Sequence, residues 1–274
     1  MLTRIIPSTG EALPAIGIGT YRGFDVGKDG KARTALAEVL RNLYAAGGSV
    51  LDSSPMYGRA EEVAGDLLAA EGARGKTFVA TKVWTTGRRA GVEEMNRSMK
   101  LLRAEPIDLM QIHNLVDWCT HLATLRAWKE EGRVRYLGVT HYSSSAYGQL
   151  EHILGTEELD FVQLNYSLDD REAERRLLPI AATRGVAVLV NLPYGQGRMF
   201  ERLRGQPVPA WMREAGCATW AQAFLKFVLS QKAVTCVIPG TGNPDHMAEN
   251  CRAGLEPMLD DSVRKKLVEF WDSQ

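Results

Sequence analysis

The segment IDLMQIHNLVDWCTHLATLRAWKEEGRVRYLGVT, residues 107–140, decides the fold of this chain. It begins and ends with apolar, β-branched runs, at 107–113 and 134–140. Between these runs, large apolar residues recur every three or four positions, at Trp118, Leu122, Leu125 and Trp128. This spacing is typical of one face of a helix, and apolar runs without alternation are typical of strands covered on both faces. The segment therefore predicts a strand–helix–strand unit with parallel strands.

The same unit repeats along the chain of 274 residues. Further strand-like runs occupy residues 15–20, 49–52, 77–83, 160–166, 186–192 and 233–239. The first connection carries a helical face formed by Leu36, Val39, Leu40 and Leu43. Eight alternating units in a chain of this length favour a closed (β/α)8 TIM barrel over an open doubly wound sheet. Because no linker-like segment divides the chain, we expect a single domain spanning residues 1–274.

The two ends of the repeat carry additional pieces. LTRIIP and ALPAI, joined by STGE, predict a short N-terminal hairpin that plugs the bottom of the barrel. Residues 193–211, rich in glycine and proline, predict a long loop on the face that holds active sites in such barrels, where it would form a lid. Val263, Leu267 and Phe270 predict a C-terminal helix packed outside the barrel.

Composition excludes several classes of partner. Lys and Arg (33) balance Asp and Glu (33), and no run of five like charges occurs, so we expect no binding to nucleic acid or to an anionic membrane. No apolar stretch is long enough for a signal peptide or a membrane span, so a cytoplasmic location is expected. The four cysteines form no CxxC pair, which predicts free, mostly buried thiols. No histidine precedes His113, so a metal-dependent hydrolase is disfavoured and we expect no metal site.

Four polar residues follow or end consecutive predicted strands, where barrel side chains converge on one pocket. They are Asp52, Tyr57, Lys82 and His113. Taken alone, each has an ordinary structural alternative, such as a helix cap for Asp52, a surface aromatic for Tyr57 or an ion-pair partner for Lys82. Together they predict an acid, a phenol, a lysine and an imidazole at a single site.

The segments around these residues resemble the aldo-keto reductase superfamily in order and spacing over nearly the whole chain. The similar segments are LDSSPMYGRAEEVAGDLL, ATKVW, DLMQIHN, LGVTHY, FVQLNYSL and VIPGTGNPDHMAEN. The resemblance implies that Asp52, Tyr57, Lys82 and His113 form a catalytic tetrad that reduces an aldehyde or ketone with NADPH, with NADH as the alternative cofactor. The segment GIG at 17–19 is no dinucleotide fingerprint, because Arg22 stands where a third glycine is needed. The superfamily binds its nucleotide without a Rossmann domain.

The chemistry of carbonyl reduction explains these residue types. A carbonyl oxygen becomes negative when hydride reaches its carbon, and Tyr57 would donate the proton that neutralises it. We expect the Lys82 ammonium to lower the high pKa of this phenol, with Asp52 holding Lys82 in place. A neutral His113 would donate a hydrogen bond to the carbonyl oxygen and orient it.

The resemblance also predicts the cofactor site, with departures near the nicotinamide. Gln163 matches the glutamine that binds the carboxamide, although it is equally well read as a core amide. Thr140 and His141 replace the usual Ser-Asn pair, and Asn191 replaces the aromatic residue that stacks on the ring. Tyr194 would substitute for that stack from the following loop. Three more residues complete the predicted set: Gly19, Thr20 and Gly195.

The adenosine end of the predicted site departs from the pattern as well. Gly240 and His246 replace the usual Lys and Arg of the 2′-phosphate site, while Thr241 and Asn250 match. A helix begun by the segment 243–244 would offer free amides to phosphate. Because a histidine charge is conditional, we expect the preference for NADPH over NADH to rise as the pH falls.

The substrate pocket is less defined by sequence. Tyr21, Trp84 and Trp118 lie just past predicted strand ends, where aromatic side chains line apolar pockets or simply pack between barrel and helices. We expect a small carbonyl compound as substrate. Its identity, the physiological direction and the oligomeric state are left open.

Two alternative functions were weighed. Lys82 as a Schiff-base nucleophile is disfavoured, because a lysine paired with Asp52 stays protonated. A non-catalytic, cofactor-sensing subunit related to the superfamily is the second alternative, since the predicted cofactor positions are altered.

Overall fold

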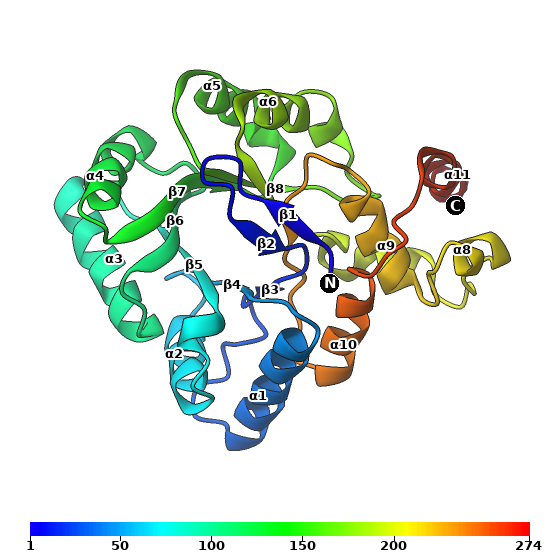
Figure 1. The fold of residues 1–274 in the computed structure, drawn as a ribbon, viewed down its shortest axis with the longest axis horizontal. Coiled ribbons are helices and arrows are strands. Elements are labelled where there is room, and N and C mark those ends of the chain that lie inside the picture. Colours follow the sequence, from blue (N-terminus) through cyan, green and yellow to red (C-terminus); the bar gives the residue numbers. More distant parts are fainter.

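The computed structural model describes residues 1–274 and contains eight parallel strands arranged as a nearly closed barrel with helices around it (Figure 1). The strands follow one another in sequence order from β3 to β10. Single parallel bridges join Ile16 to Val237 and Gly19 to Gly240, which connects the first strand to the last. The predicted (β/α)8 barrel is confirmed.

The barrel strands are β3 (Ile18–Gly19), β4 (Val50–Asp52), β5 (Phe78–Val83), β6 (Ile107–His113), β7 (Val134–His141), β8 (Phe161–Asn165), β9 (Ala187–Asn191) and β10 (Cys236–Val237). The helices around them are α1 (Gly30–Ala45), α2 (Ala60–Ala70), α3 (Arg88–Leu102), α4 (Trp118–Glu130), α5 (Tyr147–Thr156), α6 (Leu177–Arg184), α7 (Arg198–Arg202), α8 (Ala210–Glu214), α9 (Trp220–Leu229), α10 (Pro244–Arg252) and α11 (Asp261–Asp272). Short 3-10 turns lie at Arg74–Lys76, Ser144–Ala146, Glu172–Glu174 and Gly195–Gly197.

An antiparallel hairpin closes the bottom of the barrel, as predicted. Its strands are β1 (Thr3–Ile5) and β2 (Ala12–Pro14). Ile6 and Leu13 of the hairpin are buried in one cluster with the barrel residues Phe78, Tyr136 and Phe161. Burial of these large apolar side chains supplies the hydrophobic stabilisation of the barrel interior.

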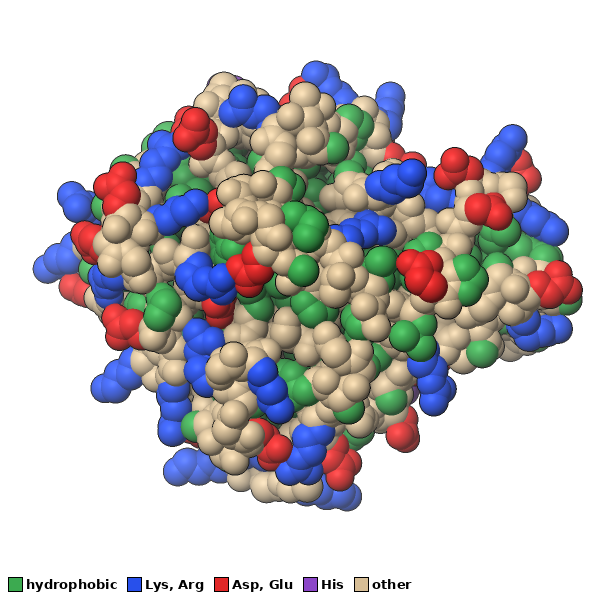
Figure 2. All heavy atoms as spheres, viewed as in Figure 1, with side chains coloured by type: hydrophobic (Ala, Val, Ile, Leu, Met, Phe, Trp, Pro, Cys, Tyr) green, Lys and Arg blue, Asp and Glu red, His purple; other side chains and the backbone are tan.

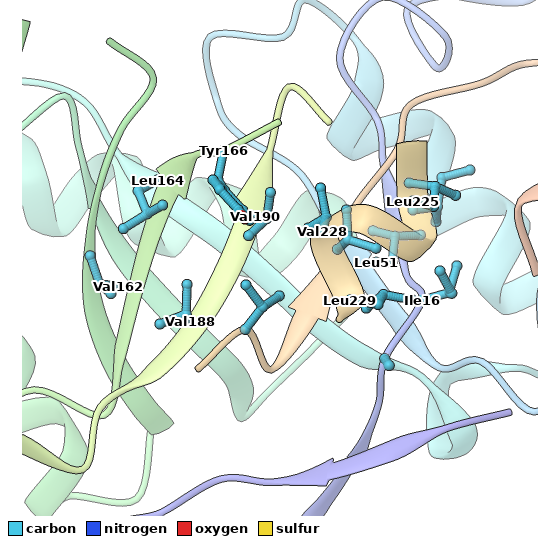
Figure 3. Close-up of a cluster of buried hydrophobic side chains, with 14 of the residues drawn as sticks. Ile16, Leu51, Val162, Leu164, Tyr166, Val188, Val190, Leu225, Val228 and Leu229 are labelled. Carbon is cyan, nitrogen blue, oxygen red and sulfur yellow. The ribbon is translucent and has the colours of Figure 1, made fainter. Parts of the chain in front are cut away.

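A second apolar layer lies between the strands and the outer helices. Figure 3 draws part of it, with Leu225 and Val228 of α9 near Ile16 and Leu51, and the aliphatic residues of β8 and β9 nearby. The predicted helical face of α1 is buried in the same layer. Side chains on both faces of the strands are therefore covered, which explains the apolar runs without alternation.

The prediction for the segment after β9 was incorrect. Residues 193–211 do not form an irregular loop: they contain the helix α7 and the start of α8. Their apolar side chains Met199 and Leu203 are buried, and burial stabilises short helices that propensity alone does not. The predicted C-terminal helix is confirmed as α11: Leu267 and Trp271 are buried, and Val263 and Phe270 pack, partly buried, against the apolar layer.

The surface carries charges of both signs. Figure 2 shows Lys and Arg side chains interspersed with Asp and Glu over the face that carries the hairpin. No helix combines the length and the apolar character needed to cross a bilayer. All four cysteines are free, and three of them are buried whereas Cys119 is exposed, which confirms the prediction for the thiols.

Candidate active site

The four residues predicted to act together do meet at the carboxyl ends of the strands. Asp52 is the last residue of β4, and Lys82 lies near the end of β5, with its side chain wholly buried. Lys82 Nζ donates to Asp52 Oδ2 at 2.6 Å and to the Ser53 carbonyl oxygen at 2.6 Å. A buried ammonium needs such partners, because an unpaired charge in this environment would be strongly unfavourable.

Tyr57 and His113 complete the cluster. Tyr57 lies in the turn between β4 and α2, and its ring centroid is 5.1 Å from Lys82 Nζ. His113 ends β6, and its ring meets the Tyr57 ring edge-on with 5.9 Å between centroids. All four predicted residues therefore share one site.

The electrostatics of Tyr57 differ from the prediction. Burial raises the pKa of Tyr57 above its usual value, and the Lys82 ammonium offsets this only in part. The expected net lowering is therefore incorrect, because desolvation of the phenolate outweighs the nearby positive charge. Burial lowers the pKa of Lys82, whereas Asp52 and Tyr57 raise it by a larger amount. The net shift of the Lys82 pKa is therefore upward, and the ammonium is retained.

His113 is a neutral imidazole in this site. Its Nδ1 lies 2.9 Å from the Ser54 hydroxyl oxygen. Burial, followed by the positive charge of Lys82, lowers the pKa of His113 to about 2. The ring therefore carries one N–H over the physiological pH range, as the sequence predicted, and a neutral ring offers one hydrogen-bond donor.

The second oxygen of Asp52 is bound by two amides. Gln163 Nε2 donates to Asp52 Oδ1 at 2.9 Å, and Gln111 Nε2 donates to it at 3.2 Å. The Thr140 hydroxyl donates to Gln163 Oε1 at 3.1 Å. Gln163 thus links Asp52 to Thr140, and its amide is tied to side chains within the site.

Sequence reasoning missed Gln111 and Glu61. Gln111 precedes His113 by two positions in β6, and side chains two apart in a strand share a face, so its position was a usable signal. Glu61 on α2 is buried and accepts hydrogen bonds from the hydroxyls of Thr81 at 2.5 Å and Ser98 at 3.0 Å. It follows Tyr57 by four positions, but only tertiary structure reveals these partners.

The residues predicted near the nicotinamide lie at the ends of β7 and β9. His141 stacks flat on Tyr142, with ring centroids 5.3 Å apart, and its Nδ1 accepts the Ser143 N–H at 3.1 Å. Burial lowers the pKa of His141. Asn191 ends β9 and has a buried Oδ1 with no hydrogen-bond partner.

Tyr194 connects two predicted cofactor elements. Its hydroxyl donates to Asn250 Oδ1 at 2.6 Å, and its ring lies 4.9 Å from the Phe200 ring. Gly195 follows it with a positive φ of 55° and is buried. The ring of Tyr194 is therefore fixed at both ends by neighbouring side chains.

The adenosine end of the predicted site is built around the start of α10. Asn243 caps this helix by accepting the Asp245 N–H at 2.9 Å, and Pro244 is its first residue, as predicted. Thr241 accepts the Asn243 N–H at 3.0 Å. His246 is exposed in the first turn of the helix.

Gly19 and Thr20, both predicted at the cofactor site, lie near the seam where the first and last barrel strands meet. Gly19 pairs with Gly240 across the seam. Thr20 is wholly buried, and its hydroxyl donates to the Ser53 hydroxyl oxygen at 2.9 Å. The Thr20 side chain therefore supports the turn after Asp52.

Two of the three predicted substrate aromatics flank the cluster. Tyr21 is 48% exposed, with its ring 5.0 Å from that of Tyr57. Trp84 is 43% exposed, with its ring 6.3 Å from that of His113. Trp118 instead packs, partly buried, against the apolar layer beneath the helices.

The barrel and this cluster define a class of protein: a TIM barrel with a phenol, a buried ion pair and a neutral imidazole at its mouth. The sequence profile described as "Aldo/keto reductase family" matches residues 15–272. The chain belongs to this family.

Several known proteins resemble the chain. It is 28% identical over 262 residues to methylglyoxal reductase YeaE of Escherichia coli, covering 91% of this chain and 89% of the relative. An aldo/keto reductase from Klebsiella pneumoniae, solved in complex with NADP and acetate, superposes with a TM-score of 0.81 at 24% identity, covering 97% and 94% of the two chains. The holo form of an aldo-keto reductase from Bacillus halodurans gives 0.79 at 21% identity, covering 99% and 96%. These structures share the barrel fold.

Proposed function

We propose that this protein reduces an aldehyde or ketone to the alcohol with NADPH, or with NADH, and that Tyr57 donates the proton. One observation carries the proposal: the buried Lys82–Asp52 pair lies against Tyr57, with the neutral His113 beside it. This arrangement brings together a proton donor and a hydrogen-bond donor where a carbonyl oxygen would gain charge. NAD(P)H-dependent reduction is also the activity of the family.

The residues at the mouth fit a nicotinamide cofactor. Asn191 has a buried amide oxygen with no partner, as expected of a group that meets a polar ligand. We assign Asn191, Thr140, His141 and Gln163 to the carboxamide end of the site. When bound, the reduced cofactor supplies a hydride. The Klebsiella relative is described as a complex with NADP, which supports this choice.

A second group of residues, around the start of α10, would hold the adenosine end of the cofactor. Thr241, Asn250 and the start of α10 are assigned to the phosphates, because the free N–H groups of a helix start favour negative charge. His246 in the first turn is assigned to the 2′-phosphate. Gly19, Thr20, Gly195 and Gly240 complete the proposed set.

Each member of the tetrad has a separate task in the proposed reaction. Tyr57 is protonated at neutral pH, because burial raises its pKa, and it gives its proton to the carbonyl oxygen. Lys82 stabilises the phenolate that remains, and Asp52 keeps Lys82 charged and in place. His113 donates its single N–H to the carbonyl oxygen and orients the substrate.

Neither of the two alternatives is supported. The upward pKa shift of Lys82 keeps its amine protonated, whereas a Schiff-base nucleophile must lose that proton. The cofactor-sensing alternative gains no support from the relatives, which carry the names of reductases. The Escherichia coli relative is named a methylglyoxal reductase, so small aldehydes are a natural first set of substrates to test.

The decisive experiment is Tyr57→Phe, assayed by NADPH oxidation with methylglyoxal and a panel of aldehydes. A positioned general acid contributes about 10² to 10⁴ in rate, so kcat should fall by at least about a hundredfold while the Kd for NADPH stays within about twofold. Tyr142→Phe is a matched control, because it removes an exposed phenol and keeps the ring that stacks on His141. If Tyr57→Phe keeps more than about a tenth of the activity, Tyr57 is not the proton donor.

A further inference from the structure

A buried histidine outside the tetrad holds the loop 84–87, which follows β5 at the mouth of the barrel. His121 of α4 is wholly buried, and its Nε2 lies 2.7 Å from the Thr85 carbonyl oxygen. A carbonyl oxygen only accepts, so Nε2 carries the proton and donates. Nδ1 is buried and has no partner. The ring is thus committed to this one hydrogen bond.

The packing around His121 leaves little freedom for the ring. Gly91 of α3 lies against it: a Cβ added at Gly91 would be 2.4 Å from His121 Cε1. Only a residue without a side chain allows so close an approach. The ring is therefore fixed between α3 and α4 with its Nε2 directed at the loop.

Two carboxylates hold the same loop at its ends. Glu94 of α3 accepts the Trp84 N–H at 2.5 Å. Asp117, just before α4, accepts the Gly87 N–H at 2.7 Å. Glu94, Asp117 and His121 together fix the backbone at three of the four loop residues. These side chains come from α3, from α4 and from the residue just before α4.

This fixed backbone carries an exposed aromatic side chain toward the site. Trp84 is 43% exposed although its backbone is held, and its ring lies 6.3 Å from the His113 ring. Tyr21, also exposed, lies beside Tyr57. Two flat apolar surfaces therefore flank the proposed proton donor Tyr57 and hydrogen-bond donor His113. Such surfaces favour a flat, apolar ligand group, because aromatic rings pack well against one another.

We propose that His121 is a positioning residue: it fixes the loop 84–87 and so holds Trp84 where its ring packs against an aryl group of the substrate, which makes KM for aryl aldehydes depend on His121. The proposal rests on the proposed function, since it concerns the substrate of that same site. His121 touches no substrate; it acts through the backbone of Thr85 on the neighbouring Trp84.

The first test measures the loop without using catalysis. His121→Leu removes the donor at similar volume, and His121→Gln retains an N–H that can reach the Thr85 carbonyl. Amide hydrogen exchange of peptides covering residues 84–87 should become about tenfold faster in His121→Leu and stay near wild type in His121→Gln, because a lost anchor lowers the free energy of local opening. His152→Leu, at an exposed histidine on α5, is the control and should change nothing.

The second test measures specificity with NADPH and two aldehydes, 4-nitrobenzaldehyde and propanal. His121→Leu should raise KM for the aryl aldehyde about fivefold or more, in line with the loss of one hydrogen bond. KM for propanal and kcat for both should stay within about twofold. In a Trp84→Ala background, His121→Leu should have no further effect on the aryl KM, because the residue through which it acts is gone.

The outcomes separate this proposal from the proposed function. Unchanged exchange at 84–87 in His121→Leu overturns the anchor, whatever the activity. Faster exchange with an unchanged ratio of the two KM values, or an equal effect in the Trp84→Ala background, overturns the role in specificity. A wild type that reduces neither these two aldehydes nor any member of a wider panel of aldehydes and ketones overturns the proposed function, and the exchange measurement then still decides whether His121 holds the loop.

Discussion

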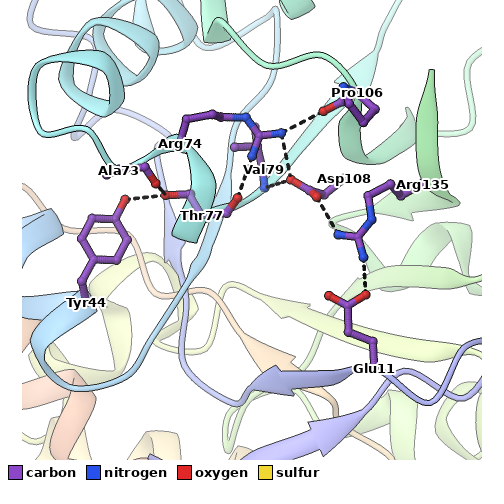
Figure 4. A network of polar contacts seen from close by, with 9 residues as sticks. All are labelled: Glu11, Tyr44, Ala73, Arg74, Thr77, Val79, Pro106, Asp108 and Arg135. Carbon is purple, nitrogen blue, oxygen red and sulfur yellow. Dashed lines mark hydrogen bonds and ion pairs between the residues drawn. The ribbon is translucent and has the colours of Figure 1, made fainter. Parts of the chain in front are cut away.

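The two ends of the barrel treat their polar groups in opposite ways. At the bottom, Asp108 of β6 accepts the Val79 N–H at 2.8 Å and binds Arg135 at 2.7 Å and Arg74 at 3.3 Å (Figure 4). Arg135 also pairs with Glu11 of the hairpin region. Every charged side chain of this network has a partner of opposite sign, and the network ties the plug to the strands.

At the mouth, buried polar atoms are left without partners. Asn191 Oδ1, at the end of β9, and Asn114 Oδ1, in the turn after β6, are buried and have no hydrogen-bond partner. The mouth also buries a charged group, the Lys82 ammonium, which is paired with Asp52. Large aromatic side chains, Tyr21 and Trp84, are exposed. Such groups lower stability, and proteins retain them where a ligand or reaction requires them. The comparison supports the proposal that the bottom of the barrel stabilises the fold and that the mouth holds the active site.

The largest expected effect concerns the buried pair at the mouth. Lys82→Met should reduce kcat for NADPH-dependent aldehyde reduction by about 10² to 10⁴. In the proposed reaction Tyr57 acts when it is protonated. Lys82 lowers the pKa of Tyr57, so removing Lys82 should move the alkaline limb of the residual activity to higher pH. The pH profile of NADPH oxidation measures this, with thermal melting as the check on folding. An unchanged profile would show that Lys82 does not tune Tyr57.

At the bottom of the barrel, removal of one partner of an ion pair should affect stability alone. Asp108→Ala leaves the Val79 N–H and two guanidinium groups without their acceptor, and should lower the free energy of unfolding by about 2 kcal/mol. Asp108→Asn keeps an acceptor for Val79 and should cost less. Urea unfolding measures both variants, and kcat should stay at the wild-type value well below the melting temperature. A large drop in kcat would contradict the conclusion that the bottom of the barrel affects stability alone.

The depressed pKa of His113 makes the mouth sensitive to acid. The native ring stays neutral down to about pH 2, whereas a histidine in the unfolded chain gains a proton near pH 6.5. The unfolded state therefore binds the extra proton, and stability falls as the pH decreases below 6.5. Between pH 7 and pH 5 the contribution is about 2 kcal/mol. Urea unfolding at both pH values should show this slope in wild type, and His113→Gln should reduce the difference by that amount.

The smallest expected effect is a gain in stability at the mouth. Asn191→Leu removes a buried oxygen without a partner and should raise the free energy of unfolding by about 1 kcal/mol, while weakening NADPH binding. Asn165, its neighbour in the β8–β9 register, is the matched control, because its amide is bound to Asp170 and Tyr147. Asn165→Leu should lower stability. Equal losses of unfolding free energy in both variants would contradict the conclusion that the unpartnered Asn191 oxygen lowers stability.

The sequence alone determined the barrel and the membership of the site. Apolar runs spaced by helical patterns define the order of strands, because covered strands and amphipathic helices leave a direct mark on residue spacing. The run 107–113 coincides with β6. Placement at strand ends was also enough to bring Asp52, Tyr57, Lys82 and His113 together, since parallel strands in a barrel end on one face.

Only the tertiary structure decided the contacts and energies of that site. The two amides on Asp52, the buried Glu61 and the bond from His121 to Thr85 join residues far apart in sequence, and spacing along one chain carries no record of such pairs. The direction of the Tyr57 pKa shift depends on the balance between burial and one nearby charge. The short helices after β9 depend on buried contacts in the same way. Periodicity reports which face of an element is covered, whereas through-space partners and desolvation exist only after the chain has folded.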